Sequence, residues 1–518
     1  MIHLTGKQLI NGAFTARSSK TFTASNRLLA MPLPDIFHEA TAEEVAEACE
    51  TAGLAFPFYR KKSGMQRALF LEAIAAKILD LGDQLLEQAH IETGLPLARL
   101  QGERGRTVGQ LNLFAKLLRD GHWVNAIIDT PQPERKPVPR GDIRSMQIAL
   151  GPVAVFGASN FPFAFSLAGG DTASALAAGC PVIFKAHPAH PGTCELVANA
   201  ILQAIKETAM PAGVFSMVHG ASHEVGMTLV RHQQIKAVGF TGSFRGGKAL
   251  FDAAARREEP IPVYAEMGSV NPVFFLPNAI KEKKSDLAKG LAASITLGVG
   301  QFCTNPGLFV LEDGEESRLF AEAARAELGA AQKAPMLTEA ISETYMEGVN
   351  LLARLTSTEI EGDISKPRIF LSDTATVVAN ETLSEEVFGP CSVGVMATDK
   401  AEIIAFAKAL KGQLTATIHG TEADLVEYRE LIEVLQLKAG RLVINGFPTG
   451  VEVGYAMMHG GPFPASTDSR STSVGTNAIY RFTRPLCFQD FPESLLPPEL
   501  QLHNPLGIHR TIDGILMK

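Results

Sequence analysis

Apolar positions recur at helical spacing near the start of the chain and change, beyond residue 150, to short β-rich runs separated by helices. Residues 41–44 (TAEE) have the composition of a capping box, which predicts a helix through about Ala52. Residues 65–93 predict one long helix, or two with a break near Gly82, and a further helix is expected over about 104–118. The first 120 residues should therefore be mostly helical after a short β-rich start.

From residue 151 onward, strand-like and helix-like runs alternate. The runs GPVAVFG, PVIFK, VFSMVHG, IKAVGF and IPVYAEMG are each predicted as strands, with helical patterns between them. Repeated β-α-β units imply a parallel, doubly wound sheet whose ligand site lies beyond the carboxyl ends of the strands. A second α/β region is expected from about 267 to 470, with the strands PVFFL, GLFVLE, SVGVMA and GRLVING. The predicted fold class is thus α/β.

A proline-rich segment, residues 131–142, separates two possible strands at 125–129 and 144–150. It is either a surface loop or the tip of an extended β-arm that pairs with another element, and the residues alone leave both open. The tail, residues 476–518, is aromatic and poorly helical, so it could supply strands and a docking surface.

Length and charge narrow the class of protein. A chain of 518 residues is too long to fold around a single hydrophobic core, so two or three domains are expected. The net charge of −8 gives no electrostatic support for a nucleic-acid or anionic-membrane partner. The start lacks a basic region followed by an apolar one, and no apolar run approaches the ~20 residues that span a bilayer, so we expect a cytoplasmic location. Six cysteines without a CxxC pair or metal spacing argue against a metal site and a disulfide framework.

Three residues are candidates for catalysis. Cys303 lies in GVGQFCTNPG, where glycines permit close backbone approach and a turn could expose the sulfur; the alternative is a buried inert thiol. Glu266 follows an apolar strand, which would raise its pKa and suit a base near neutral pH, unless it is an exposed loop residue. Asn160 could donate to an oxyanion, or it is an ordinary turn residue.

Two further segments could hold an anionic ligand. In GFTGSFRGG, Ser243 and the backbone N–H groups near Gly246 and Gly247 could face an anion at the start of a helix, although a glycine-rich turn without a ligand has the same pattern. Lys185 ends a strand and points toward the expected crevice, unless it is a solvated strand-end lysine.

The motifs SNFPF, IFKAHP, GFTGS, AEMGSVNP, GQFCTNPG and EEVFGP occur in an order that resembles the aldehyde dehydrogenase superfamily, over about residues 20–490. The resemblance implies a Rossmann-type NAD(P)-binding domain, an α/β catalytic domain and a small β oligomerisation arm, and hence a homodimer or homotetramer. The implied boundaries are 1–124 and 151–265 for the NAD(P)-binding domain, 266–475 for the catalytic domain, and 125–150 and 476–518 for the arm and tail.

The same resemblance assigns roles to residues. It implies Cys303 as nucleophile, Glu266 as general base and Asn160 as oxyanion donor. For the nucleotide it implies Lys185 at the adenosine ribose. The implied pyrophosphate loop comprises Gly242, Ser243 and Gly247, and the implied nicotinamide subsite comprises Glu386 and Phe388.

Departures from the family pattern also carry information. Ser159 replaces the usual Trp, and Met267 and Ser269 replace Leu and Gly. Pro188 stands where NAD-preferring members often carry a glutamate that holds the ribose 2′-hydroxyl. We therefore expect NADP as the cofactor, with NAD possible. Candidates for binding the 2′-phosphate are Lys185, His187 and His190.

The segments HGGPFPASTDSRSTSVG and NGFPTGVEV resemble those of α-ketoglutarate semialdehyde dehydrogenases, which implies oxidation of that aldehyde to 2-oxoglutarate. The alternative is an NADP-dependent fatty aldehyde dehydrogenase. Candidates for binding the acid group of the substrate, in the first of these two segments, are Ser466, Ser469 and Arg470, although all three could simply lie in a surface loop. Less favoured are a thiol hydrolase that pairs Cys303 with a histidine, and a non-catalytic binding protein.

Overall fold

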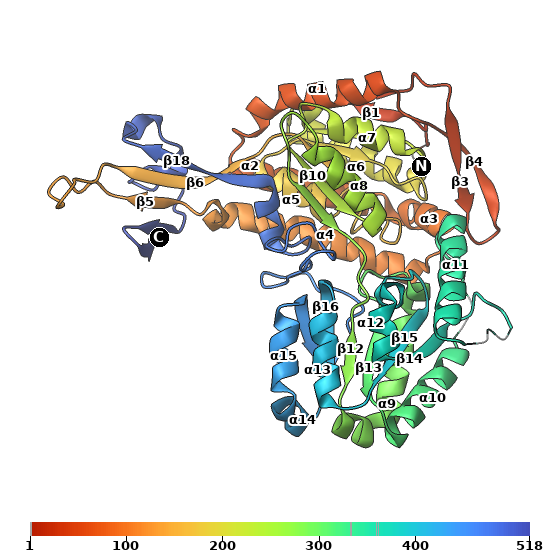
Figure 1. Ribbon diagram of the computed structural model, residues 1–518. Coiled ribbons are helices and arrows are strands. Elements are labelled where there is room, and N and C mark those ends of the chain that lie inside the picture. The colour runs from red at the N-terminus through yellow and green to blue at the C-terminus, as the bar shows by residue number, and fades with distance from the viewer. Residues whose placement is uncertain (1–2, 332–333, 359, 361) are drawn as a thin grey trace.

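Four β-sheets organise the chain in a computed structural model that describes residues 3–331, 334–358, 360 and 362–518 (Figure 1). The first sheet has seven strands, of which five are parallel and two, β1 and β2, extend one edge antiparallel. Its order is β11 (Val263–Glu266), β10 (Ala237–Thr241), β7 (Val153–Phe156), β8 (Val182–Lys185), β9 (Phe215–Val218), β1 (Gln8–Ile10) and β2 (Ala13–Thr15). The parallel part is the doubly wound sheet that the alternating pattern predicts.

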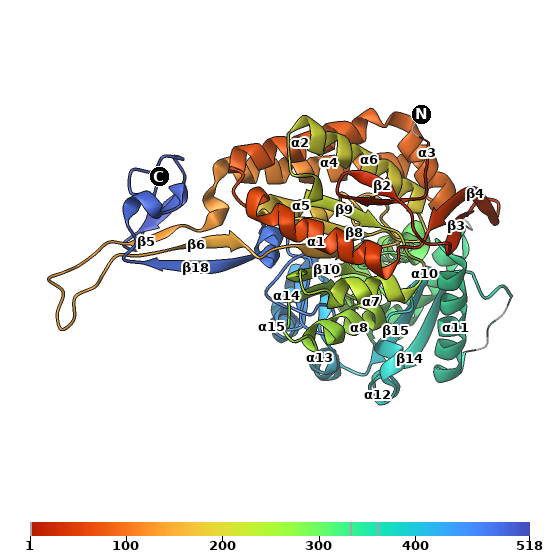
Figure 2. The same ribbon diagram turned by 90° about the horizontal axis from the view of Figure 1, so that it is seen from above.

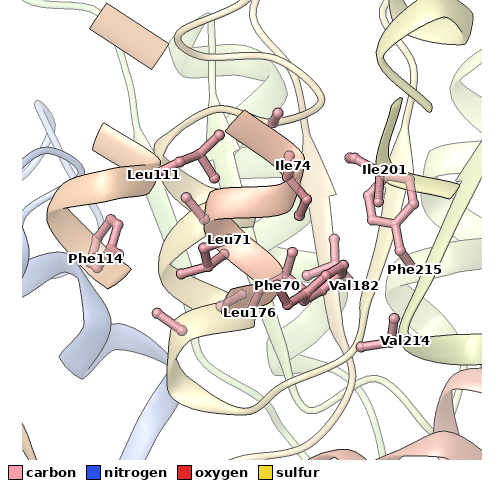
Figure 3. Packing of buried hydrophobic residues seen from close by; sticks show 14 of the residues in the cluster. Phe70, Leu71, Ile74, Leu111, Phe114, Leu176, Val182, Ile201, Val214 and Phe215 are labelled. Atoms are coloured by element: carbon pink, nitrogen blue, oxygen red, sulfur yellow. The ribbon is translucent and has the colours of Figure 1, made fainter. Parts of the chain in front are cut away.

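Helices cover both faces of this sheet, and Figure 2 shows it between the two layers. One layer, packed on the core around Val238 and Ile183, consists of α1 (Ala42–Tyr59), α7 (His223–Arg231) and α8 (Phe244–Ala255). The other comprises α2 (Gly64–Asp80), α3 (Gly82–Thr93), α4 (Leu97–Asp120), α5 (Gly170–Ala178) and α6 (Pro191–Glu207). Figure 3 shows Leu71 of α2 and Leu111 of α4 in the core that this second layer shares with β8 and β9.

Helices form where the sequence predicts them, but α1 and α4 are longer than expected. The Thr41 hydroxyl accepts from the Glu44 N–H and the Glu44 carboxylate accepts from the Thr41 N–H, which forms the expected capping box. Helix α1 continues past Ala52 because Ala55 and Tyr59 are buried in the core. A break at Gly82 separates α2 from α3, and α4 begins before residue 104.

The second sheet is parallel throughout, with six strands. Its order is β14 (Arg368–Asp373), β15 (Cys391–Ala397), β13 (Leu308–Glu312), β12 (Val273–Phe275), β16 (Gln413–His419) and β17 (Ala439–Ile444). Helices α9 (Pro277–Thr296) and α10 (Glu315–Gly329) pack on one face, and α11 (Glu339–Leu355), α13 (Lys400–Ala409) and α15 (Arg429–Gln436) on the other. Short helices α12 (Thr374–Ala379) and α14 (Glu422–Glu427) complete the region. The sequence reading anticipated neither β14 nor β16.

A projecting arm contains the third sheet, in the order β18 (Thr483–Gln489), β6 (Ile143–Ala149), β5 (Ile127–Asp129), β19 (Arg510–Ile512) and β20 (Ile515–Met517) (Figure 1). The proline-rich segment is the tip of the β5–β6 hairpin, where Gln132 pairs with Arg140. Of the two readings of this segment, the extended arm is therefore the one observed. A separate hairpin joins β3 (Thr21–Asn26) and β4 (Met31–His38). None of the described helices is both long and apolar enough to cross a membrane.

A buried ion pair fastens the start of the tail to the first sheet's helices. Arg481 lies in the 3₁₀ helix η5 (Thr476–Phe482), and its Nη2 is 2.6 Å from Asp171 Oδ1 in α5. Both side chains are more than nine-tenths buried. Removal of either partner leaves an uncompensated charge in the interior.

We expect Arg481→Met to lower the free energy of unfolding by about 3–5 kcal/mol, because Asp171 loses its buried partner. Urea unfolding measures the change. The matched control is Arg470→Met, since Arg470 is exposed and pairs with the neighbouring Asp468, and its effect should stay within about 0.5 kcal/mol. Equal effects of the two substitutions would contradict a structural role for the buried pair.

Candidate active site

Cys303 lies in a loop that close backbone contacts fix in place. Gly300 has φ +68°, and a Cβ atom there would lie 2.2 Å from the carbonyl carbon of Gly389, so only glycine permits this approach. The Asn271 side-chain amide donates to the carbonyl of Cys303 at 2.9 Å and to that of Asn305 at 2.9 Å. The thiol therefore sits on a backbone held from two sides.

His459 brings the thiol and a carboxylate together. Its Nε2 lies 3.4 Å from Cys303 Sγ and 2.9 Å from Glu266 Oε1. Glu266 is the last residue of β11, and its other carboxylate oxygen accepts from the Ser473 hydroxyl. The Ser473 N–H in turn donates to the His459 carbonyl at 2.8 Å. A thiol, an imidazole and a carboxylate in mutual reach can exchange protons.

The burial of this group changes the pKa values of its members. Burial raises the pKa of Cys303 well above its ordinary value, the Glu266 carboxylate raises it further, and Arg106 opposes them weakly. Burial also raises the pKa of Glu266, but the His459 imidazole and the Ser473 hydroxyl outweigh this and leave it lowered. The raised pKa expected for Glu266 from its apolar approach is therefore wrong in direction. Cys303 is a neutral thiol near neutral pH and needs a base to become nucleophilic.

Sequence reasoning did not single out His459. It stands 156 residues after Cys303, as the first residue of HGGPFPASTDSRSTSVG, the segment that departs from the usual family pattern. That departure was the available signal. Among the described residues, Glu266, Cys303 and His459 are the one group whose donor atoms lie within 4.8 Å of one another, as metal ligands would. The absence of a metal stays a prediction.

Asn160 follows β7 and lies against the nucleophile loop. Its Nδ2 donates to the Gln301 carbonyl at 3.0 Å, and its own carbonyl accepts from Arg99 Nη2 at 2.7 Å. A side-chain amide has two N–H groups, so one is left for a substrate oxyanion. Ser159, where the family usually has tryptophan, is half-buried beside it.

The expected nucleotide residues lie along one edge of the first sheet. Strands β10, β7 and β8 are adjacent and parallel, so Ser243, Asn160 and Lys185 follow the same carboxyl edge. Ser243 caps α8 by accepting from the Gly246 N–H at 3.2 Å. A Cβ atom on Gly247 would lie 2.7 Å from Met267 Cγ, and Gly242 is exposed before the helix start. An exposed helix start on the same sheet edge as a lysine fits the phosphates of a dinucleotide.

The histidines proposed for a 2′-phosphate differ from expectation. His190 is fully buried, with Nε2 3.0 Å from the Ala158 carbonyl and Nδ1 3.5 Å from Cys194 Sγ, so it packs the interior and cannot reach a ligand. Burial, His190 and Lys185 lower the pKa of His187 well below its usual value, which leaves it neutral. Burial lowers the pKa of Lys185 to about 8. Pro188 is half-buried beside this group.

The loop before β15 carries the residues expected at the nicotinamide. Glu386 lies against Gly268, since a Cβ atom there would approach Glu386 Oε2 to 2.5 Å. Burial raises the pKa of Glu386 to about 8, opposed by the Ser269 N–H and assisted by the charge of Glu266. Phe388 follows, half-buried. Glu386 is thus close enough to Glu266 for the two charges to interact, and the nucleotide contacts of Glu386 and Phe388 stay predictions.

The three expected substrate anchors have different environments, and Ser466 alone is buried, with its backbone paired to Glu266. The Ser466 hydroxyl donates to the Gly461 carbonyl at 2.6 Å, Ser469 is exposed, and Arg470 is exposed and paired with Asp468. For Ser469 and Arg470 the observed environment is the surface loop named as the alternative; Ser466 is buried.

The sequence model described as "Aldehyde dehydrogenase family" matches residues 15–483. The chain belongs to the aldehyde dehydrogenase family. This aldehyde dehydrogenase is 50% identical to "Alpha-ketoglutaric semialdehyde dehydrogenase 2" of Azospirillum brasilense, over 99% of each chain. It is 48% identical to "Alpha-ketoglutaric semialdehyde dehydrogenase" of Acinetobacter baylyi, over 99% of this chain and 98% of that one.

Solved structures show the same fold for the enzyme. A 1-pyrroline-5-carboxylate dehydrogenase from Thermus with bound NAD superposes with a TM-score of 0.78 at 20% identity, over 93% of this chain and 92% of that chain. A betaine aldehyde dehydrogenase from Staphylococcus aureus gives 0.78 at 20% identity, over 95% and 96%. The expected aldehyde dehydrogenase-like α/β fold is confirmed.

We expect Glu266→Gln to move the pH profile of Cys303 alkylation by iodoacetamide to lower pH. The Glu266 charge is, after burial, the second cause that raises the thiol pKa, so its removal stabilises the thiolate. Peptide mass spectrometry separates Cys303 from the exposed Cys487. Glu259→Gln is the matched control, because Glu259 is exposed and paired with Lys236. An unchanged or raised midpoint in the Glu266 variant would show that the carboxylate does not act on the thiol.

Proposed function

We propose that this aldehyde dehydrogenase oxidises α-ketoglutarate semialdehyde to 2-oxoglutarate. The observation that carries the proposal is the full-length identity, 50% and 48%, to two proteins named for that activity. The thiol, imidazole and carboxylate of the site supply the groups that such an oxidation needs. The fatty aldehyde alternative has no comparable support.

The proposed reaction begins at the thiol. The Glu266–His459 pair, which contacts the thiol, accepts the Cys303 proton, and the sulfur adds to the aldehyde carbon. The resulting oxyanion is held by the free N–H of Asn160 and the backbone N–H of Cys303. Oxidation of this thiohemiacetal to a thioester requires a hydride acceptor, which is the chemistry that a nicotinamide nucleotide provides when bound.

Hydrolysis of the thioester falls to Glu266. Its lowered pKa keeps it ionised at neutral pH, and the Ser473 hydroxyl fixes one of its oxygens. The other oxygen takes a proton from water, which attacks the thioester and releases the acid. His459 lies 2.9 Å from that oxygen and returns its proton to the departing sulfur.

NADP is the proposed cofactor, with NAD as the alternative. Pro188 offers no carboxylate that would hold a ribose 2′-hydroxyl or repel a 2′-phosphate. Lys185 is the remaining cation of the three residues considered, since His190 is fully buried and His187 is neutral. The same proposal includes the other nucleotide-binding residues that the resemblance implies, which are Gly242, Ser243, Gly247, Glu386 and Phe388.

The remaining organisation is also proposed. The domain boundaries are those expected above, although Glu266 itself ends a strand of the first sheet. Two arms pair in a cytoplasmic homodimer or homotetramer. In support, Ile515 and Leu516 on the edge strand β20 are 65% and 71% exposed, which is the kind of edge that a second subunit would cover.

A second candidate function, ester hydrolysis without nucleotide, is favoured by the Cys303–His459 contact alone. A thiol with a histidine in reach is also the arrangement of a thiol hydrolase. The family membership makes this at most a side reaction of the same thiol.

We expect the purified enzyme to reduce NADP fastest, by kcat/KM, with α-ketoglutarate semialdehyde. The panel includes succinate semialdehyde and long aliphatic aldehydes, each with NADP and NAD, and absorbance of the reduced nucleotide is the readout. A strong preference for long aliphatic aldehydes would overturn the proposed substrate, and a preference for NAD the proposed cofactor. Ester cleavage without any nucleotide reduction would indicate the hydrolase instead.

Asn160→Ala should lower kcat by about 10²–10³, because one oxyanion donor is lost while the fold is kept. Cys303→Ala should abolish turnover and leave nucleotide binding intact, as measured by fluorescence titration. The control for a general loss of structure is the melting temperature of each variant. Near-normal activity of Cys303→Ala would refute the assigned nucleophile.

A further inference from the structure

We infer that Arg106, on α4, binds the substrate's distal carboxylate and so selects aldehydes that carry an anionic group. The inference rests on the proposed function, because it concerns the same site and names the chemical class of substrate that the site accepts. It replaces the expected anchors, since Ser469 and Arg470 are exposed and the Ser466 hydroxyl is bonded to the Gly461 carbonyl.

Arg106 is a cation without a partner in the part of the chain that the structure describes. Its Nη1 is buried and makes no hydrogen bond, and no carboxylate lies at salt-bridge distance. The neighbouring arginines of α4 differ: Arg99 donates to the Asn160 carbonyl at 2.7 Å, and Arg104 donates to the Gly82 carbonyl at 2.7 Å. A buried charged donor left unsatisfied costs more than a neutral one, so a bound anion would be stabilising.

The carboxylate nearest to Arg106 along the helix, that of Glu103, is engaged through one oxygen, while its Oε2 is buried without a hydrogen-bond partner among the described residues. Glu103 attracts the guanidinium, but its Oε1 accepts from the Phe163 N–H at 2.8 Å and from the Ala164 N–H at 2.9 Å. The backbone N–H groups of the loop that follows Asn160 thus hold the Glu103 carboxylate. Arg106 stays available to a ligand.

The position of Arg106 relative to the nucleophile is set by two rings. Its guanidinium lies over the Phe165 ring, 5.1 Å from the centroid. The Phe165 ring centroid is 6.3 Å from that of His459, whose Nε2 contacts Cys303 Sγ. Arg106 is close enough to lower the pKa of Cys303, against the larger effect of burial. The Arg106 guanidinium and the His459 imidazole therefore both lie near the Phe165 ring, and His459 contacts Cys303.

The dimensions suit a short oxo-acid. In α-ketoglutarate semialdehyde the aldehyde carbon and the carboxylate carbon are four C–C bonds apart, about 5 Å when extended. Guanidinium groups bind carboxylates through paired hydrogen bonds, which gives orientation as well as energy. Aromatic rings provide the wall for the methylene groups: Phe161 packs against Phe165 at 5.3 Å and against Phe302 at 5.2 Å.

Two other arginines near the thiol, Arg99 and Arg441, are tied to backbone carbonyls. Arg99 lies between the Phe161 and Phe302 rings, at 5.2 and 4.8 Å, and holds the backbone of Asn160. Arg441 donates to the Pro448 carbonyl at 2.6 Å and to the Gly450 carbonyl at 3.1 Å. Arg99 and Arg441 each keep one buried nitrogen without a partner, but their other N–H groups are held by backbone carbonyls. Among the described residues the Arg106 guanidinium makes no hydrogen bond to the protein, so its whole fork is available to substrate.

The test compares α-ketoglutarate semialdehyde with pentanal, a neutral aldehyde of the same length, in wild type, Arg106→Met and Arg106→Lys. We expect Arg106→Met to lower kcat/KM for the acid by about 10- to 100-fold, mainly through KM, and to leave kcat/KM for pentanal within about 3-fold. Arg106→Lys should recover part of the loss, because it keeps the charge without the planar fork. Arg104→Met, on the same helix, is the matched control and should affect neither substrate.

The affinity for the product can be measured in a variant that does not turn over. In the Cys303→Ala background, calorimetry should show that Arg106→Met weakens 2-oxoglutarate binding by a similar factor. Equal losses for the acid and pentanal, or no loss for either, would overturn the role of Arg106. If wild type prefers another carboxylate-bearing aldehyde, the proposed substrate fails while the anchor stands. If wild type prefers pentanal and does not bind 2-oxoglutarate, both fail.

Discussion

The contact of one imidazole nitrogen with a thiol and a carboxylate is the interaction on which the active site depends. His459 Nε2 faces both Cys303 and Glu266, and each of these three side chains comes from a different part of the chain. Glu266 ends a strand of the first sheet, Cys303 lies in the loop that leads into the second, and His459 follows the last strand of the second. The two sheets must therefore meet correctly before any of the three groups has its partner.

The segment that brings His459 to the site also joins the two sheets. The Met267 N–H donates to the Ala465 carbonyl at 2.8 Å and the Thr467 N–H to the Ala265 carbonyl at 3.1 Å, so residues beyond His459 pair with the end of β11. Ser473 then returns to Glu266. The segment that departs from the usual family motif thus supplies the imidazole and the hydroxyl that contact Glu266.

Features encoded by neighbouring residues were predictable from the sequence, and features made by distant ones were not. The capping box at Thr41 and the alternation from β7 to β11 depend on local composition, and both are observed. Strand β16 is fully buried and reads QLTATIH, which lacks the apolar run that marked its neighbours. The contact of His459 with Cys303 joins residues 156 positions apart, and no local pattern encodes it. The motif order located Cys303, Glu266 and Asn160 but could not show that the apolar approach to Glu266 ends beside an imidazole and a hydroxyl.

The order of the catalytic side chains along the chain has a consequence for synthesis. Asn160, Glu266 and Cys303 emerge from the ribosome in that order, and the histidine and the serine that contact Glu266 follow only near the end of the chain. Until then the sulfur lacks the imidazole that would take its proton. The first sheet waits for the same segment, because residues 465–467 pair with the end of β11 and Arg481 supplies the buried partner of Asp171. The last part of the chain therefore completes the active site and the first core in one step, and a chain truncated before it would lack both.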